Sequence, residues 1–454
     1  MMLSNRSIAM KNMTVGSPFR LILFFTIPLI IGNILQQMYS FIDTLIVGRV
    51  LGVNALAAVG STGSLMFLLI GIVMGLTNGF AIIAGHYYGA GDMSKVRQSV
   101  ATSLILSLIF SVFLTLGAVC LSRPFLEWMQ TPPEILSDAS VFLTIICAGT
   151  SAFLLLNLLS NLSRAFGNSR TPLYFLLLST VLNVVLELTF LLGFGWGIAG
   201  AALATILAIF LTALIYLIYF LRCDTLFRFQ KQDWLSPPSF WLSHLRTGVS
   251  MAFQSSTVAI GSIILQTSLN QFGTTAIAAY SAAQKIDAIA NMPMMSFGMT
   301  MAAYTAQNFG AKKLDRIADG VRACIRISVS FALIIGLINM TCGPWLIGLF
   351  VGNEERDVIE LAQIYLNRTG IAYFVLALLF IYRYTLQGLG KNAIPTLSGF
   401  IELAVRIFSA VVIASYFGYS GLCLSSPLSW TLACIPLAIA YYLTMRNFIS
   451  RTEK

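Results

Sequence analysis

Apolar residues run in long blocks along this chain, and short breaks of Gly, Pro or charged residues separate the blocks. Most blocks are 20 residues or longer, which is the length a helix needs to cross the roughly 30 Å hydrocarbon core of a bilayer. The pattern therefore predicts an all-α polytopic membrane protein with twelve transmembrane helices. The expected spans lie near 21–48, 55–86, 99–121, 138–163, 172–194, 197–221, 246–270, 276–307, 321–350, 360–388, 395–417 and 420–446.

The longest polar break covers residues 222–245 and is rich in Arg, Lys, Ser and Pro. Such a segment is typical of a connection between larger parts of a chain. We therefore expect an N-terminal lobe over 1–221 with spans 1–6, a cytoplasmic linker over 222–245, and a C-terminal lobe over 246–454 with spans 7–12.

The two halves repeat one another in sequence. The matching segments are 51–58 with 272–279, 88–90 with 309–311, and 167–172 with 390–395. The offset is 221 residues for the first two pairs and 223 for the third. Because each half has six spans, both enter the membrane in the same direction. The repeat predicts two six-helix lobes related by a pseudo-two-fold axis along the membrane normal, an arrangement that suits alternating access.

Composition and charge agree with a membrane location. The chain is 57% hydrophobic and 10% charged, whereas about a quarter of the residues are charged in a typical soluble domain. Placing the N-terminus in the cytoplasm puts most Lys and Arg of the connections on that side and leaves Arg49, Arg123 and Arg356 outside. The positive-inside rule then predicts a multi-pass cell-membrane protein with both termini cytoplasmic. The net charge of +10 is expected to meet anionic lipid headgroups and not nucleic acid.

Residues for enzymatic chemistry are sparse. The two histidines, His86 and His244, lie near block ends, the seven cysteines form no CxxC pair, and no complete phosphate-binding loop is present. We expect neither an enzyme nor a metal or cofactor site, so an ion gradient or the substrate gradient must drive any transport.

Ionisable residues inside the predicted spans are the main functional candidates, because each costs at least about 2.5–3.5 kcal/mol to insert. Asp43 shares one helix face with Gln36 and Tyr39, at spacings of three and four residues. Such a polar stripe indicates a cavity or a partner helix. Pro28 and Gly32 are the candidate hinge of the same span.

Glu187 lies one helical turn after Asn183, and Thr205 stands in the next span. Carboxylate, amide and hydroxyl oxygens together can hold a proton or a desolvated sodium ion. The alternative is that these groups only satisfy one another between helices.

The second half carries a different set of charges. Glu402 and Arg406 are four residues apart and can neutralise each other. Lys285 and Asp287 flank Ile286 and cannot pair along one helix face, so each needs another partner, and a structural network is the alternative to a functional one. Arg383 stands in the tenth span.

The eighth span is rich in methionine, including Met292, Met295 and Met299. Thioethers adapt to varied apolar shapes and recur at promiscuous binding surfaces. These residues are either substrate contacts or ordinary packing beside a proline kink.

The chain resembles the multidrug and toxic compound extrusion (MATE) family over nearly its whole length. The resemblance rests on the order of these motifs: Ile27-Pro28, Phe41-Ile42-Asp43-Thr44, Gly89-Ala90, Arg164-Ala165-Phe166-Gly167-Asn168-Ser169-Arg170-Thr171-Pro172, Gly310-Ala311 and Leu386-Gln387-Gly388-Leu389-Gly390. It implies a cation-coupled antiporter that exports amphipathic, mostly cationic compounds.

Within this family the chain looks most like the DinF-like branch, whose ion site lies in the N-terminal lobe. The resemblance assigns ion coupling to Tyr39, Asp43, Asn183, Glu187 and Thr205, with Glu187 replacing an aspartate. It allows sodium at Asp43, Asn183 and Glu187, so the coupling ion is either a proton or sodium.

Another branch of the family has acids in the seventh and tenth spans. Here Gln254 and Arg383 stand in those spans, so no ion site is expected there, although Gln254 remains a candidate for substrate contact. The candidate substrate-binding residues are Gln36, Gln254, Met292, Met295, Met299, Glu402 and Arg406.

Three functions follow from these features. The first is a cation-coupled multidrug antiporter, a monomer whose partners are small organic cations and membrane lipids. The second is a lipid-linked oligosaccharide flippase of the related superfamily, which needs a cationic cavity for a pyrophosphate. The third is a receptor or channel, which the two-lobe repeat and the lack of a ligand domain disfavour.

Overall fold

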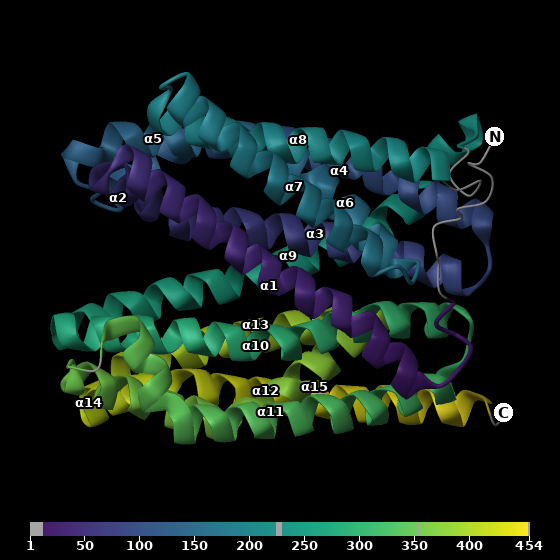
Figure 1. Ribbon diagram of the computed structural model, residues 1–454. Helices are drawn as coiled ribbons and strands as arrows, with labels where there is room; N and C mark the ends of the chain where they lie inside the picture. The colour runs from purple at the N-terminus through teal and green to yellow at the C-terminus, as the bar shows by residue number, and fades with distance from the viewer. Residues whose placement is uncertain (1–11, 224–228, 353, 453–454) are drawn as a thin grey trace. The chain divides into compact units, whose positions relative to one another are not determined.

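The computed structural model describes residues 12–223, 229–352 and 354–452. Within these ranges the chain is helical and contains no strand (Figure 1). The helices of the first half are α1 (Pro18–Leu51), α2 (Val53–Ser61), α3 (Gly63–Gly89), α4 (Met93–Trp128), α5 (Pro133–Ala148), α6 (Thr150–Ala165), α7 (Arg170–Leu188) and α8 (Gly197–Cys223). Those of the second half are α9 (Pro238–Leu269), α10 (Gly273–Gly310), α11 (Leu314–Val351), α12 (Arg356–Gly388), α13 (Ala393–Phe408), α14 (Ala414–Cys423) and α15 (Ser425–Thr452).

The helices account for the predicted spans. Ten helical stretches of the described chain are long and apolar enough to cross a membrane. The pair α5 and α6, bent by 48°, forms an eleventh. One of the ten, Pro238–Gly310, has 73 residues, which is too long for one crossing and contains both α9 and α10. Dividing it gives twelve spans, so the predicted all-α, twelve-helix membrane fold is confirmed.

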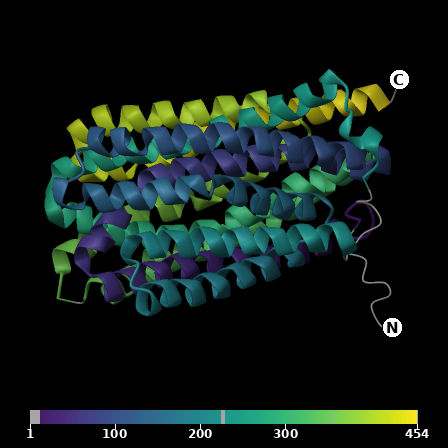
Figure 2. The ribbon, with the colours of Figure 1, turned by 90° about the horizontal axis from the view of Figure 1, so that it is seen from above.

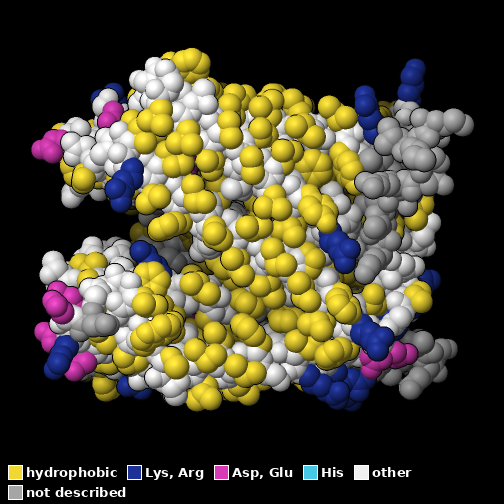
Figure 3. Space-filling view, in the orientation of Figure 1, with side chains coloured by type: hydrophobic (Ala, Val, Ile, Leu, Met, Phe, Trp, Pro, Cys, Tyr) yellow, Lys and Arg dark blue, Asp and Glu magenta, His cyan; other side chains and the backbone are white. Residues whose placement is uncertain are grey.

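The exposed surface fits a lipid environment. Many large apolar side chains are exposed, such as Phe113 at 70% and Val181 at 60%. On the face shown in Figure 3, hydrophobic side chains cover the middle of the helices, and Lys, Arg, Asp and Glu lie toward the helix ends. This distribution matches a hydrocarbon belt between two polar headgroup regions.

The internal repeat is visible in the backbone. Positive φ angles recur at matched positions, in the pairs Gly52 (88°) with Gly273 (85°), Gly91 (75°) with Lys312 (58°), Gln130 (58°) with Gly352 (87°), and Gly167 (83°) with Gly390 (73°). The offsets are 221 to 223 residues, as in the sequence repeat. The fifth span of each half also contains a five-residue π-helix, Thr189–Gly193 and Ser409–Ile413.

The described chain forms two compact units. The first contains Ile31–Ala252, and the second contains Met13–Ile30 together with Phe253–Lys454. The chain therefore passes from one unit to the other inside α1 and again inside α9. This division reports which segments pack together, and it does not test the predicted lobes or the linker at 222–245. Those boundaries stay a prediction.

Residues 13–30 belong to the second unit because of specific contacts there. The Met13 N–H donates to Gln307 Oε1 at 2.9 Å. The Thr26 and Thr300 hydroxyls are 2.7 Å apart. Ile22 and Phe25 are buried in the same hydrophobic core as Met294 and Met301. The helices of each unit lie lengthwise alongside one another (Figure 2).

In the first unit, α3 and the first part of α9 pack with almost no space between their backbones. A Cβ added at Gly79 would lie 2.6 Å from the Cα of Gly248, and one at Gly75 would overlap Ala252. Small residues at such crossings let membrane helices approach closely.

The described part of the predicted linker is anchored to α4. Asp233, in a short 3₁₀ helix (Lys231–Trp234), is fully buried and pairs with Arg97 at 3.2 Å. Ser236 and Thr102 are 3.0 Å apart, and Ser99 lies 2.7 Å from His244 Nε2. Residues 224–228 of the predicted linker lie outside the described ranges.

Candidate functional site

Five polar residues from α1, α7 and α8 meet inside the first unit. The Asn183 amide donates to Thr205 Oγ1 at 3.1 Å. The Tyr39 hydroxyl is within hydrogen-bonding reach of Thr205, and the Asp43 carboxyl is within reach of the Glu187 carboxyl. The structure thus brings together all five residues predicted for ion coupling, although their role in coupling stays a prediction.

The oxygens of this cluster outnumber its hydrogen-bond donors. Both carboxyl oxygens of Glu187 and Oδ1 of Asn183 are buried and accept no hydrogen bond from any described residue. Glu187 is fully buried, and Asn183 is 1% exposed. Two facing carboxylates repel each other and can only accept, so a shared proton or a small cation stabilises them together. The arrangement is chemically suited to bind a proton or a sodium ion.

The local helix geometry supports this site. Glu187 lies two residues before the π-helix Thr189–Gly193, in which the Thr189 hydroxyl turns back to the Val185 carbonyl at 2.6 Å. Single π turns inside α-helices are frequent at functional sites.

The predicted hinge coincides with a change of packing partner. Pro28 lies inside α1, where its ring removes one backbone hydrogen bond. The chain leaves the second unit between Ile30 and Ile31. Gly32 already packs in the first unit, where an added Cβ would touch Leu173 at 3.7 Å. Whether α1 bends there stays a prediction.

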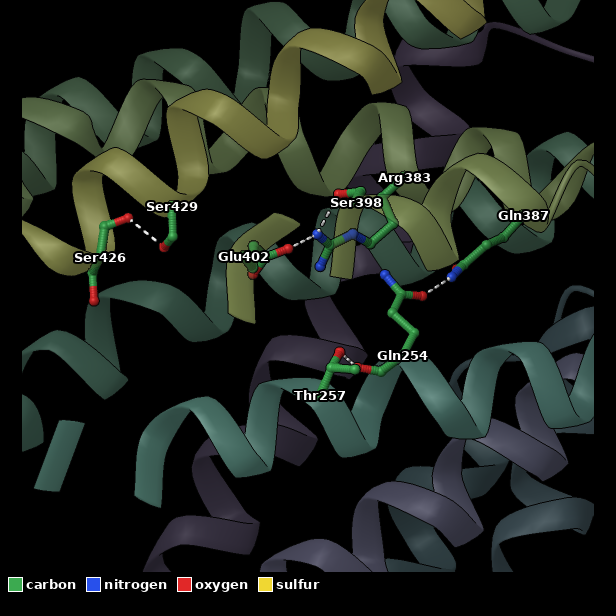
Figure 4. A network of polar contacts seen from close by, with 8 residues as sticks. All are labelled: Gln254, Thr257, Arg383, Gln387, Ser398, Glu402, Ser426 and Ser429. Carbon is green, nitrogen blue, oxygen red and sulfur yellow. Dashed lines mark hydrogen bonds and ion pairs between the residues drawn. The ribbon is translucent and has the colours of Figure 1, made fainter. Parts of the chain in front are cut away.

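The expected pairing of Glu402 with Arg406 is wrong. Glu402 of α13 instead forms a buried ion pair with Arg383 of α12, and Arg383 Nη2 also donates to Ser398 Oγ at 3.0 Å (Figure 4). Glu402 is 4% exposed. Arg406 packs against Gly261 and donates to Ser262 Oγ at 3.4 Å. Spacing along one helix missed this partner because Arg383 reaches Glu402 from a neighbouring helix.

Comparison with known proteins identifies the family. The MatE family model matches residues 28–189 and 250–445, most of the chain. The chain belongs to the MatE family. It is therefore a membrane transporter and not an enzyme, as the sequence predicted.

Relatives and solved structures agree with this membership. The chain is 28% identical to the probable multidrug resistance protein YoeA of Bacillus subtilis, over 88% of each chain. It is 23% identical to the multidrug export protein MepA of Staphylococcus saprophyticus, over 96% of this chain and 97% of the relative. Its fold matches a crystal structure of MATE in the bent conformation with a TM-score of 0.90, at 20% identity over 99% and 100% of the two chains.

Gln254 of this MatE protein lies in the same polar region as Arg383. It is 6% exposed, and its Oε1 accepts from Gln387 Nε2 at 2.7 Å (Figure 4). Its backbone carbonyl accepts from the Thr257 hydroxyl at 2.7 Å. The sequence named Gln254 as a substrate contact but did not foresee its amide partner on α12.

Asp287 and Lys285 each have a separate partner, as their spacing predicted. Asp287 accepts from the Tyr373 hydroxyl at 2.7 Å, from Asn291 at 2.9 Å and from Tyr365 at 3.3 Å. The Lys285 ammonium lies 5.9 Å from the Phe350 ring centroid. This network favours the structural alternative for Asp287, because neutral donors surround its carboxylate.

The methionines of α10 divide into two groups. Met294 and Met301 are fully buried in the hydrophobic core of the second unit. Met292, Met295 and Met299 are half-buried, and Met299 packs against that core. Gln36, half-buried on α1, is not part of the polar network around Asp43 in the described residues. A substrate role for these four stays a prediction.

Proposed function

We propose that this transporter exports amphipathic, mainly cationic organic compounds in exchange for protons or sodium ions. Its relatives are named as multidrug resistance and multidrug export proteins. The observation that carries cation coupling is the Asp43–Glu187 pair, where both buried carboxyl oxygens of Glu187 lack a donor and the Asp43 carboxyl lies within reach.

The pair links ion binding to substrate binding by competition. With both carboxyls ionised, the site attracts a cation. A proton or sodium ion removes part of that negative charge, so its entry weakens the hold on a cationic substrate. The two ligands then bind alternately, and the free energy of ion entry drives export. Bending of α1 at Pro28 and Gly32 would couple the site to alternating access.

Location and assembly belong to the same proposal. By the positive-inside rule, the basic connections favour a cell-membrane protein with both termini in the cytoplasm, and we expect a monomer surrounded by lipid. A flippase for lipid-linked oligosaccharides is less well supported, because Glu402 neutralises Arg383. That buried arginine therefore does not offer the free positive charge that a pyrophosphate requires.

Dye export from proteoliposomes tests the proposal. Purified protein is reconstituted, proton and sodium gradients are imposed separately, and ethidium movement is followed by fluorescence. One gradient should drive transport in wild type, and both Asp43→Asn and Glu187→Gln should slow it at least about tenfold, as for loss of a directly bound charge. Asp319→Asn is the matched control, since Asp319 forms an exposed pair with Arg322. Gradient-driven export by Asp43→Asn at the wild-type rate would refute the assignment.

A further inference from the structure

A second polar cluster lies buried in the second unit. It is made by α9, α12 and α13, which contribute Gln254, Arg383, Gln387, Ser398 and Glu402 (Figure 4). Each of these side chains is at least nine-tenths buried. Burying so many polar groups costs stability unless their hydrogen bonds are made.

The hydrogen bonds of this cluster leave specific groups without partners. Arg383 uses Nη2 for Glu402 and Ser398, while its Nε donates to no described residue. Gln254 uses Oε1 for Gln387, while its Nε2 donates to none. Figure 4 shows the Gln254 amide nitrogen turned toward Arg383. Two unused donors, one of them on a guanidinium, thus lie in the same buried region.

Two aromatic residues are chain neighbours of the cluster. Phe253 precedes Gln254 on α9, and Phe400 lies between Ser398 and Glu402 on α13. Their ring centroids are 5.8 Å apart, and they are 55% and 43% exposed. Their chain neighbours Gln254 and Gly399 are packed together, since a Cβ at Gly399 would lie 3.1 Å from Gln254 Cγ. The backbone segments that carry the rings and the donors are therefore packed against each other.

We infer that this cluster is a subsite for the carboxylate of an amphipathic zwitterionic substrate. The Arg383 and Gln254 donors bind the carboxylate oxygens, and Phe253 with Phe400 contacts the aromatic body. Because Glu402 neutralises Arg383, the cluster has no net charge with which to attract a free anion. A zwitterion brings its own compensating cation. This inference rests on the proposed export function and names a substrate class for it.

Two matched dyes test the subsite. Rhodamine 110 is a zwitterion with a free carboxylate, and rhodamine 123 is its cationic methyl ester. Binding of each to the purified wild-type protein in detergent, without any gradient, is measured by fluorescence anisotropy. A charge-assisted hydrogen bond contributes about 1.5–3 kcal/mol, so rhodamine 110 should bind at least about tenfold more tightly than its ester.

Variants of Gln254 identify the donor. Gln254→Met removes it and should weaken rhodamine 110 about tenfold, with a change of less than about threefold for rhodamine 123. Gln254→Glu keeps the shape but replaces the donor with a negative charge, so it should weaken rhodamine 110 further and strengthen rhodamine 123. Ser429→Ala, which removes only a 2.9 Å bond to the Ser426 carbonyl within α15, should alter neither.

The outcomes separate this inference from the proposed function. Equal affinity of wild type for the two dyes, or parallel losses for both in the Gln254 variants, would overturn the subsite while leaving ethidium export intact. Failure of gradient-driven ethidium export would refute the antiport proposal, whereas a carboxylate preference that depends on Gln254 would still support the subsite.

Discussion

The crossing of α3 and α9 is sensitive to a single added methyl group. Gly79→Ala places a Cβ 2.6 Å from the Gly248 Cα, where ordinary carbon contacts are about 3.5–4.0 Å. The two backbones must then separate by roughly 1 Å. A gap of that size forfeits about a quarter to a half of each contact energy along the crossing, and overpacking typically costs about 1–3 kcal/mol.

The helix preference for alanine over glycine opposes this cost, but it is small and can be measured separately. Alanine is favoured over glycine inside a helix by about 0.5–1 kcal/mol, so Gly79→Ala should destabilise the protein by about 1–2 kcal/mol overall. Gly117→Ala on α4 is the matched control, since no atom lies within 4 Å of its added Cβ. That control should be stabilised.

Thermal unfolding in detergent, followed by intrinsic fluorescence, distinguishes the two variants. Gly79→Ala should lower the Tm by about 1–2 °C, and Gly117→Ala should raise it slightly. Equal Tm shifts for the two variants would show that the crossing tolerates a methyl group, and the close-packing argument would be wrong.

Three further predictions use the same measurement. Lys312→Gly should raise the Tm, because Lys312 has a φ of 58° where its repeat counterpart is Gly91, and relieving that backbone strain is worth about 1 kcal/mol. Arg383→Gln should destabilise by about 3–5 kcal/mol by leaving Glu402 buried without its partner, and adding Glu402→Gln should recover most of the loss; a double variant no more stable than the single one would contradict this. A backbone N–H in the first turn of α4 bonds to Asp92 and lowers its pKa, so the cap stabilises the fold above the ordinary aspartate pKa and its effect is lost as pH falls through the lowered value. Asp92→Ala should therefore cost about 1 kcal/mol at pH 7 and less in acid, whereas Asp92→Asn should retain the cap at both pH values.

The sequence predicts well wherever one helix or one repeat decides the outcome. The face shared by Tyr39 and Asp43, and the turn from Asn183 to Glu187, follow from helical periodicity. The family resemblance joined these two sets and Thr205 into one site. The repeat likewise predicted two related halves, and the matched positive φ angles at Gly52 and Gly273 agree with that repeat.

Predictions failed where the deciding contact crosses between helices. Glu402 was assigned to Arg406 by spacing, but its partner Arg383 lies on the preceding helix of the chain. The passage of α1 from one compact unit to the other leaves no local pattern, because it depends on which distant side chains bury Ile22 and Phe25. Pro28 lies close to the point where α1 changes unit. It does not indicate which unit each part of the helix packs in.

A long time separates the synthesis of the first residues of α1 from that of their packing partners. Thr26 meets Thr300, which is made 274 residues later, and at about 5–20 residues per second that takes roughly 15–55 seconds. Throughout this time the segment Met13–Ile30 exists without the side chains that will cover it. Residues 21–30 are apolar apart from one threonine, so this part of the segment is stable in lipid before its packing partners are synthesised. The second unit is thus synthesised in two parts, Met13–Ile30 early and the residues from Phe253 onward late. The early part must stay inserted in the bilayer until the later part is made.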